Sequence, residues 1–288
     1  MKLKVLFIIF NIVLFGLLFT IFIFPFFSYE NSFFREIWRT NRIFGLIFFV
    51  LTIGIDILFF TNKKIIDNIE TGNWYNLSGY LEQQIYVKKK QSLKNIRLLT
   101  ETLLILGNFE EIEKLESFIS TEKPKYLLKL APKFAASKIL SKNYIGLKQF
   151  ASKFENNYGH NTEWMHFYSG FASYMCRDYI EAEKEFKKLI PISKNNLVKG
   201  LSAYFAYKLL NDYNGLTSEK NTADKEKNNT LAAYRQDAEH SSAIKKELQS
   251  KYTAAKWKKY IDSEKKEIYV MVLTKIIDDA SIWIFSQN

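Results

Sequence analysis

Two long apolar stretches near the start of the chain predict a membrane hairpin. Residues 5–27 contain no charged side chain, and residues 43–61 contain only Asp56. At about 1.5 Å per residue, a helix of either length crosses the roughly 30 Å hydrocarbon core of a bilayer. The segment between them is short and mixes polar and aromatic residues, so we expect a loop there. We therefore assign residues 1–62 to a membrane anchor with transmembrane helices at about 5–27 and 43–61.

Two polar residues interrupt this hairpin at matching depths. Asn11 lies seven residues after Lys4, and Asp56 lies seven residues before Lys63. In an antiparallel hairpin, we expect Asn11 and Asp56 to face each other between the helices. An ionisable residue inside a span is a functional candidate by default. A structural hydrogen bond is the alternative interpretation.

The rest of the chain has the apolar spacing of amphipathic helices. In residues 91–106, apolar residues recur at three or four positions, as with Leu93, Ile96 and Leu99, so one face is apolar. Residues 108–120 repeat this pattern, and Gly107 between them can adopt the positive φ that ends a helix. We expect a helix–turn–helix unit here and an all-α fold overall.

An aromatic residue recurs at a fixed interval through this helical region. Four aromatic residues lie 35 residues apart, each directly after Asn or Asp, and Tyr213 follows Asp212 as a fifth copy at 34. A period of 34–35 residues is typical of stacked helical hairpins. Each aromatic is predicted to begin the second helix of a hairpin, with the polar residue before it in the turn. The first four are Trp74, Phe109, Tyr144 and Tyr179.

One copy, at about 163–196, resembles the tetratricopeptide repeat (TPR). Gly170 lies nine residues before Tyr179, and Ala182 and Phe186 reproduce the A-x-x-x-F pattern of the second helix. The resemblance implies that Gly170 lets the two helices approach closely. Other copies depart from the pattern, because Glu116 and Ala151 stand at the position of Phe186. The resemblance covers about 72–215, and we assign 63–216 to a TPR-like α-solenoid of helix–turn–helix repeats.

The C-terminal third is predicted to close this solenoid. Residues 217–230 are polar and of low complexity, which predicts a loop. Beyond them we expect one long amphipathic helix to about Ala255 and a last helix at about 264–285. A solenoid needs a cap over its exposed core, so residues 231–288 are interpreted as capping helices. Docking of a partner or the membrane through Trp283, Ile284 and Phe285 is the alternative.

The TPR resemblance also implies a binding groove along the inner faces of the first helices. The resemblance implies no catalytic role for any residue. The candidate groove residues are Arg97, Lys138, Tyr174 and Tyr207.

Composition and motifs restrict the partners and the kinds of site that the sequence predicts. The net charge of +11 favours anionic lipid head groups or an acidic protein as partners. The three histidines show no metal-ligand spacing, and the chain has no nucleotide-binding or nucleophile motif, so we expect no metal, cofactor or catalytic site. Cys176, the single cysteine, is expected to be a small core residue, and a lone thiol agrees with a cytosolic face.

The sequence therefore predicts a multi-pass protein of the inner or plasma membrane, with a TPR-like scaffold that binds a protein or peptide segment. Lysine and arginine counts favour a cytoplasmic C-terminal domain. One alternative is a membrane-associated enzyme of envelope or lipid metabolism, using Asp56 with His160 or His166. Another is a basic surface for nucleic acid, which no recognised motif supports. Neither the partner nor the oligomeric state follows from the sequence.

Overall fold

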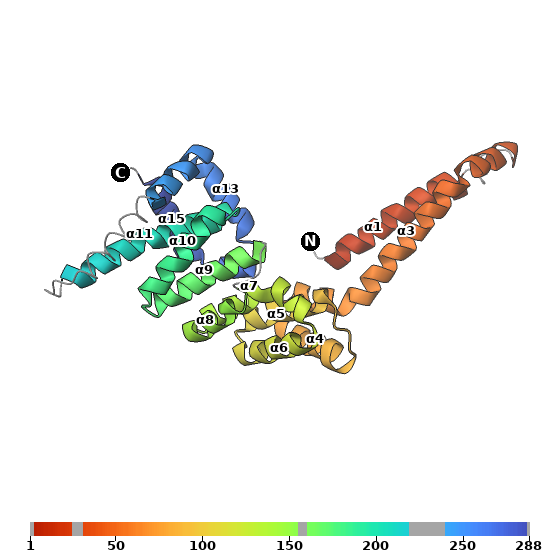
Figure 1. Ribbon diagram of the computed structural model, residues 1–288. Coiled ribbons are helices and arrows are strands. Elements are labelled where there is room, and N and C mark those ends of the chain that lie inside the picture. Colours follow the sequence, from red (N-terminus) through yellow and green to blue (C-terminus); the bar gives the residue numbers. More distant parts are fainter. Residues whose placement is uncertain (1–2, 25–30, 155–159, 219–239, 287–288) are drawn as a thin grey trace. The chain divides into compact units, whose positions relative to one another are not determined.

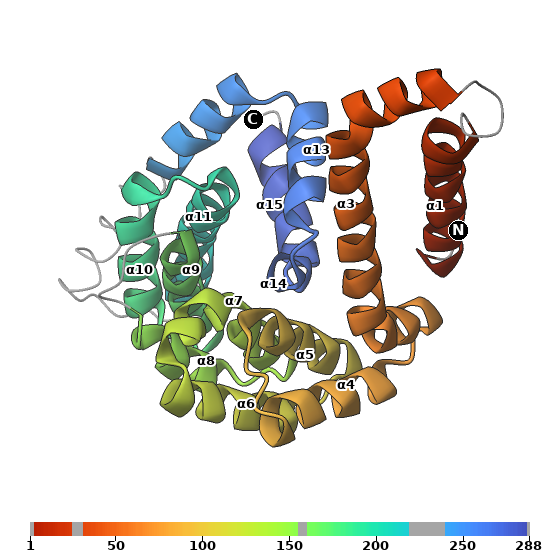
Figure 2. The same ribbon diagram turned by 90° about the vertical axis from the view of Figure 1, so that its right-hand side faces the viewer.

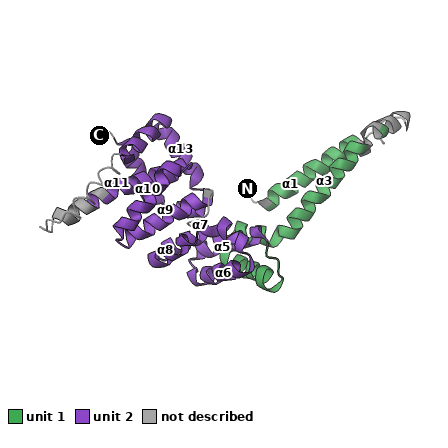
Figure 3. Ribbon diagram, in the orientation of Figure 1, with its two compact units in different colours: residues 1–91 green, residues 92–288 purple. Residues whose placement is uncertain are grey.

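The computed structural model describes residues 3–24, 31–154, 160–218 and 240–286 (Figure 1). These residues form helices, with no β-strand among them. The chain divides into two compact units, residues 1–91 and 92–288 (Figure 3). The all-α class predicted from the apolar spacing is therefore confirmed.

Unit 1 contains the two apolar helices. The first is α1 (Leu3–Leu18), which continues into a π-helical turn, η1 (Phe19–Ile23), and the second is α3 (Asn31–Thr71). Lys4–Ile21 and Ile43–Thr71 are long and apolar enough to span a membrane. The two helices pack through Phe7 and Phe59, whose rings stack 3.7 Å apart. Glu70 accepts a hydrogen bond from the backbone N–H of Lys4, where the helix dipole of α1 favours a negative charge.

Helix α3 is longer than the sequence pattern suggested. The loop expected between the two spans is already helical from Asn31, and the helix continues past the expected domain boundary at 62 to Thr71. Residues 31–44 contain neither glycine nor proline, so nothing in that segment ends a helix. Unit 1 is completed by α4 (Trp74–Glu82) and a π-helical turn, η2 (Gln83–Val87).

Unit 2 begins with seven consecutive helices that pack each on the next. Alternate helices α5, α7, α9 and α11 also contact one another in succession. The core between them holds large buried side chains, among them Trp164, Tyr168 and Phe186. The helices are α5 (Leu93–Leu106), α6 (Phe109–Glu122), α7 (Pro124–Leu140), α8 (Tyr144–Ser152), α9 (His160–Met175), α10 (Tyr179–Ile192) and α11 (Asn196–Ser218).

The same turn occurs four times in the described part of the chain. Each turn has a residue in the left-handed conformation, with φ between 57° and 66°, at Gly72, Gly107, Lys142 and Arg177. The next residue donates its backbone N–H to the carbonyl five positions back, at 2.8–3.0 Å, and this ends one helix in a Schellman motif. Its side chain accepts from the N–H three positions on, which caps the next helix. These capping residues are Asn73, Asn108, Asn143 and Asp178.

One residue thus serves both helices of each turn. It closes the carbonyl end of the first helix and caps the amide end of the second, so a segment of two or three residues satisfies backbone groups on both sides. The four helix starts predicted at the recurring aromatics are confirmed at Trp74, Phe109, Tyr144 and Tyr179.

The fifth predicted turn is wrong. Tyr213 lies inside α11, which continues without a break from Asn196 to Ser218. Asn or Asp before an aromatic residue is compatible with a helix interior when no residue switches to the left-handed conformation. Helix α11 as a whole packs against α10 and α15 (Thr274–Phe285).

The close helix approach predicted at Gly170 is present. A Cβ atom on Gly170 would lie 2.8 Å from Cε1 of Phe186, closer than real side chains allow. Ala182 and Phe186 are fully buried between α9 and α10. Only glycine therefore permits this distance between the two helices.

The C-terminal helices are shorter and placed differently from the prediction. Residues 240–251 are helical, and Thr253 then caps a separate helix, α13 (Ala254–Glu264), so the single helix expected to Ala255 is wrong. The expected helix at 264–285 is split into α14 (Ile268–Met271) and α15. The predicted loop at 217–230 lies almost wholly outside the described residues.

These helices do more than cover one end of unit 2. Helix α14 packs on α7, and α15 packs on α11. Figure 2 shows α14 and α15 on the inner side of the curved row formed by α5 to α11. The C-terminal segment thus covers part of the face on which a binding groove was predicted.

Candidate functional site

The predicted groove residues do not form one open site. Arg97 is exposed on α5. The half-buried Tyr174 donates its hydroxyl to the Asp212 carboxylate on α11. The ring of Tyr207 lies 5.5 Å from that of Trp283 on α15. The two tyrosines are therefore engaged by the chain itself.

Lys138, the fourth candidate groove residue, is buried and likewise engaged by the chain itself. Its Nζ pairs with Glu116 at 3.0 Å and lies 5.5 Å from the centre of the Phe150 ring, so its contacts lie on α6 and α8. Glu116 occupies the position that Phe186 fills two copies later and is buried. The buried carboxylate requires a cation, and Lys138 supplies it.

A second buried lysine holds the C-terminal segment on the inner face. Lys133 of α7 lies 2.9 Å from Glu101 of α5 and 2.8 Å from Glu267, the residue before α14. Its Nζ also lies 5.5 Å from the centre of the Tyr269 ring. One cation therefore links α5, α7 and the start of α14.

Aromatic contacts extend this attachment to α9. Tyr168 donates its hydroxyl to the backbone carbonyl of Tyr269 at 2.9 Å, and Trp164 meets the Tyr269 ring edge-on at 5.5 Å. Burial raises the pKa of Tyr168 well above its ordinary value and that of Tyr269 to about 12. The positive charge of Arg97 acts in the opposite direction on Tyr269. Both hydroxyls are therefore protonated at neutral pH.

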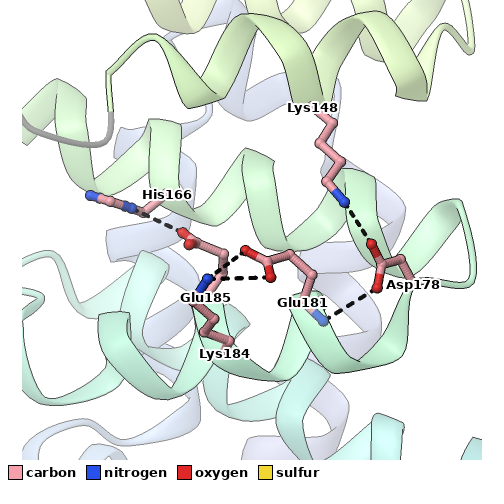
Figure 4. Close-up of polar contacts among 6 residues, drawn as sticks. All are labelled: Lys148, His166, Asp178, Glu181, Lys184 and Glu185. Atoms are coloured by element: carbon pink, nitrogen blue, oxygen red, sulfur yellow. Dashed lines mark hydrogen bonds and ion pairs between the residues drawn. The ribbon is translucent and has the colours of Figure 1, made fainter.

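The histidine considered for catalysis is enclosed in the core. His166 Nδ1 of α9 lies 3.0 Å from Glu185 of α10, and both side chains are buried (Figure 4). Neither side chain of this pair is therefore exposed to a substrate in this structure. The side chain of His160 lies outside the described residues. Within the described part of the chain, no group of three or more His, Cys, Asp or Glu side chains could hold a metal ion.

In unit 1, Asn11 and Asp56 line the same cavity. It has a volume of about 500 Å³ and is otherwise apolar, with Phe7, Phe15 and Phe60 in its wall. The Oδ1 atoms of Asn11 and Asp56 are buried, and neither has a hydrogen-bond partner among the described residues. The Asn11 amide donates to the carbonyl of Phe7. The cavity therefore presents two acceptor oxygens at the depth of the spans.

Cys176 is not a core residue, contrary to the sequence interpretation. It is exposed in the turn after α9. The apolar spacing of α9 ends before this position, so nothing packs over the thiol. The only thiol of the chain is thus open to solvent.

Sequence reasoning missed the residues that hold the C-terminal segment, chiefly Lys133, Tyr168 and Tyr269. One signal was available, because Lys133 interrupts the apolar stretch LLKLAPKFAA. A lysine on a buried helix face requires an acidic partner. The sequence does not reveal that this partner is Glu267, 134 positions further on.

Comparison with known proteins assigns a family. A family model described as "Uncharacterised Treponema protein" matches residues 111–286, so the chain belongs to this family. The match includes the helices from α7 to α15. A protein of Treponema pallidum (strain Nichols), described as "Uncharacterized protein", is 28% identical over 251 residues, which cover 86% of this chain and 77% of the relative. No solved structure matches the chain.

Proposed function

We propose that the protein is a membrane-anchored, TPR-like scaffold that binds a protein partner at the membrane surface. The observation that carries the proposal is the turn that recurs every 35 residues with the same backbone conformation and the same capping bond. A constant hairpin unit is what a repeat scaffold requires. Such scaffolds bind other chains through extended surfaces.

The packing order of unit 2 supports the repeat interpretation. Each helix contacts its neighbours in sequence, and the alternate helices α5, α7, α9 and α11 form a second set of contacts. This arrangement is expected when hairpins stack, because each hairpin covers the apolar face of the next one. The close contact of Gly170 with Phe186 follows the same pattern.

The C-terminal helices restrict where a partner segment binds. They occupy the inner face over α7 and α11, and Lys133 holds them there. Arg97 remains exposed, and its charge acts on Tyr269 of α14, so it lies beside the covered part of the face. We infer that a partner contacts the inner face around Arg97. The guanidinium favours an acidic segment.

The two candidate spans of α1 and α3 support the membrane anchor. We propose that they lie in the inner or plasma membrane with the C-terminal unit in the cytoplasm. Lys63 and Lys64 directly follow the apolar stretch 43–61 of α3, which favours a cytoplasmic location for that end. A reporter fused to the C-terminus tests the orientation, and a signal from outside the membrane would contradict it.

Site-specific photocrosslinking in cells tests partner binding. A photoreactive residue replaces Lys94, which is exposed one turn before Arg97 on α5 and leaves that guanidinium in place, and a matched variant carries it at Ile192, which is exposed at the end of α10. We expect a discrete protein adduct at position 94 that is absent at 192. Equal adducts at both positions, or none at 94, would contradict the scaffold.

A further inference from the structure

Two successive turns of unit 2 expose large apolar side chains. Leu140 and Ile145 are 43% and 68% exposed around the first turn, and Met175 and Ile180 are 40% and 70% exposed around the second. Between the members of each pair stands an exposed basic residue with positive φ. We call this set the turn ridge: Leu140, Lys142, Ile145, Met175, Arg177 and Ile180.

The two turns form one continuous surface. Lys148 of α8 donates to Asp178, the cap of α10, at 2.6 Å (Figure 4). The ring of Tyr144, at the start of α8, meets Phe171 of α9 edge-on at 6.1 Å. These contacts hold the second turn beside the first, so the apolar side chains lie at the same edge of unit 2.

The ridge carries a positive charge. Asp178 is neutralised by Lys148, and Glu181 pairs with Lys184 at 3.0 Å. Lys142 and Arg177 form no ion pair within the described ranges of the chain. Their charges are therefore available to a ligand, and the two acidic residues that follow Arg177 in sequence, Asp178 and Glu181, are already paired.

The turn itself does not require these residues. The turn between α5 and α6 has the same geometry, but Gly107 takes the place of the basic residue and Glu110 that of the second apolar residue. Glycine adopts positive φ at lower cost than lysine or arginine. The α5–α6 turn also exposes an aliphatic residue, Ile105, at the position of Leu140 and Met175. The basic residues and the second aliphatic residues, Ile145 and Ile180, are therefore the part of the ridge that the turn geometry does not explain.

We propose that the turn ridge docks on an anionic bilayer surface. The aliphatic side chains enter the head-group region, and Lys142 and Arg177 contact lipid phosphates. Surfaces that combine apolar and basic side chains bind anionic membranes through both contributions. The two candidate spans keep unit 2 close to a bilayer, which raises the effective concentration of lipid at the ridge. The proposal does not depend on the protein partner proposed above.

Cys176 provides a direct probe, because it is exposed between Met175 and Arg177 and is the only cysteine. The full chain is labelled there with an environment-sensitive fluorophore and placed, one copy per disc, in phosphatidylcholine nanodiscs with or without phosphatidylglycerol. We expect a blue-shifted emission in the anionic discs and quenching by chain-brominated lipids. A control label at Ile192→Cys in a Cys176→Ser background should remain aqueous, since the far end of α10 is about 20 Å away.

Variants separate the apolar from the electrostatic contribution to docking. Ile145→Asp with Ile180→Asp should abolish quenching of the Cys176 label in the anionic discs. Each of Lys142→Gln and Arg177→Gln should lower the docked-to-free ratio in anionic discs by about fivefold. Ile105→Asp, at the turn between α5 and α6, should leave the signal unchanged.

Three outcomes would overturn the proposal. One is an aqueous emission of the Cys176 label in anionic discs. Another is equal quenching at positions 176 and 192. The third is a blue shift that rises with protein concentration in detergent and is unaffected by phosphatidylglycerol, which would indicate that the ridge binds a second copy of the chain.

Discussion

Lys148 and Asp178 join two successive hairpins of unit 2. The Lys148 ammonium donates to one carboxylate oxygen of Asp178 at 2.6 Å, and the other oxygen accepts from the backbone N–H of Glu181 (Figure 4). The same carboxylate therefore caps α10 and binds α8. The spacing between hairpins and the start of a helix depend on one side chain.

Substitution of Asp178 should separate these two roles. Asp178→Ala removes both, and we expect a loss of about 1 kcal/mol in the free energy of unfolding. Asp178→Asn retains a capping oxygen, so its loss should be smaller, as for other exposed ion pairs. Denaturant unfolding of the full chain at neutral pH measures both. Equal losses for the two variants would show that the cap contributes nothing.

The ion pair of Lys148 and Asp178 also predicts that the stability of the folded state depends on pH. The hydrogen bond from Lys148 lowers the pKa of the Asp178 carboxyl. The folded state therefore gains stability from this group above the ordinary pKa of aspartate and loses it as the pH falls through the lowered value. Lys148→Gln should shift the pKa of Asp178, measured by NMR, back toward its ordinary value. Lys142→Gln serves as the control and should leave it unchanged.

Gly170→Ala should destabilise unit 2. The added methyl group would lie 2.8 Å from Cε1 of Phe186, and the surrounding helices are closely packed. Overpacking of this kind costs about 1–3 kcal/mol. Gly79→Ala is the matched control, because no atom lies within 4 Å of the added Cβ and alanine favours the helix. Thermal unfolding should give a lower midpoint for the first variant only.

The buried pair of Lys138 and Glu116 should behave differently when one or both charges are removed. Glu116→Ala leaves the Lys138 ammonium without its 3.0 Å partner, and we expect a loss of about 3 kcal/mol. Replacement of both residues, as Glu116→Leu with Lys138→Met, should be close to neutral, because apolar side chains fill buried space without a desolvation cost. A double-mutant cycle in denaturant measures the coupling. Additive losses would contradict the proposed pairing.

Lys133→Met should loosen the C-terminal segment. The lysine is buried, whereas Glu101 and Glu267 are partly exposed and can be hydrated when it is removed. We expect a loss of about 1–3 kcal/mol from the charged hydrogen bonds and faster proteolysis between α13 and α14. Lys129→Met, at an exposed position of the same helix, is the control. Unchanged cleavage would show that the aromatic contacts of Tyr269 suffice.

The hairpin turns were predictable because their chemistry is local. The polar residue that caps each helix and the aromatic residue that begins it are neighbours in sequence, so a period of 35 residues makes them visible. The prediction of a fifth turn at Tyr213 failed because it used only this local pair of residues. The polar–aromatic pair alone does not define the turn. The turn also needs the residue before the capping Asn or Asp to adopt the left-handed conformation.

The pattern of apolar residues along the chain determines the all-α class, the two candidate spans and four of the turns. It does not determine what lies against each helix face. Packing between segments that are distant in sequence pairs Lys133 with Glu267. It also pairs Lys138 with Glu116 and places Tyr269 against Trp164. A helix-forming segment contains its own hydrogen-bond partners, whereas a buried charge or a covered groove depends on which distant segment approaches it. Tertiary packing therefore decided that the C-terminal helices cover the inner face of unit 2 and that the turn ridge stays exposed.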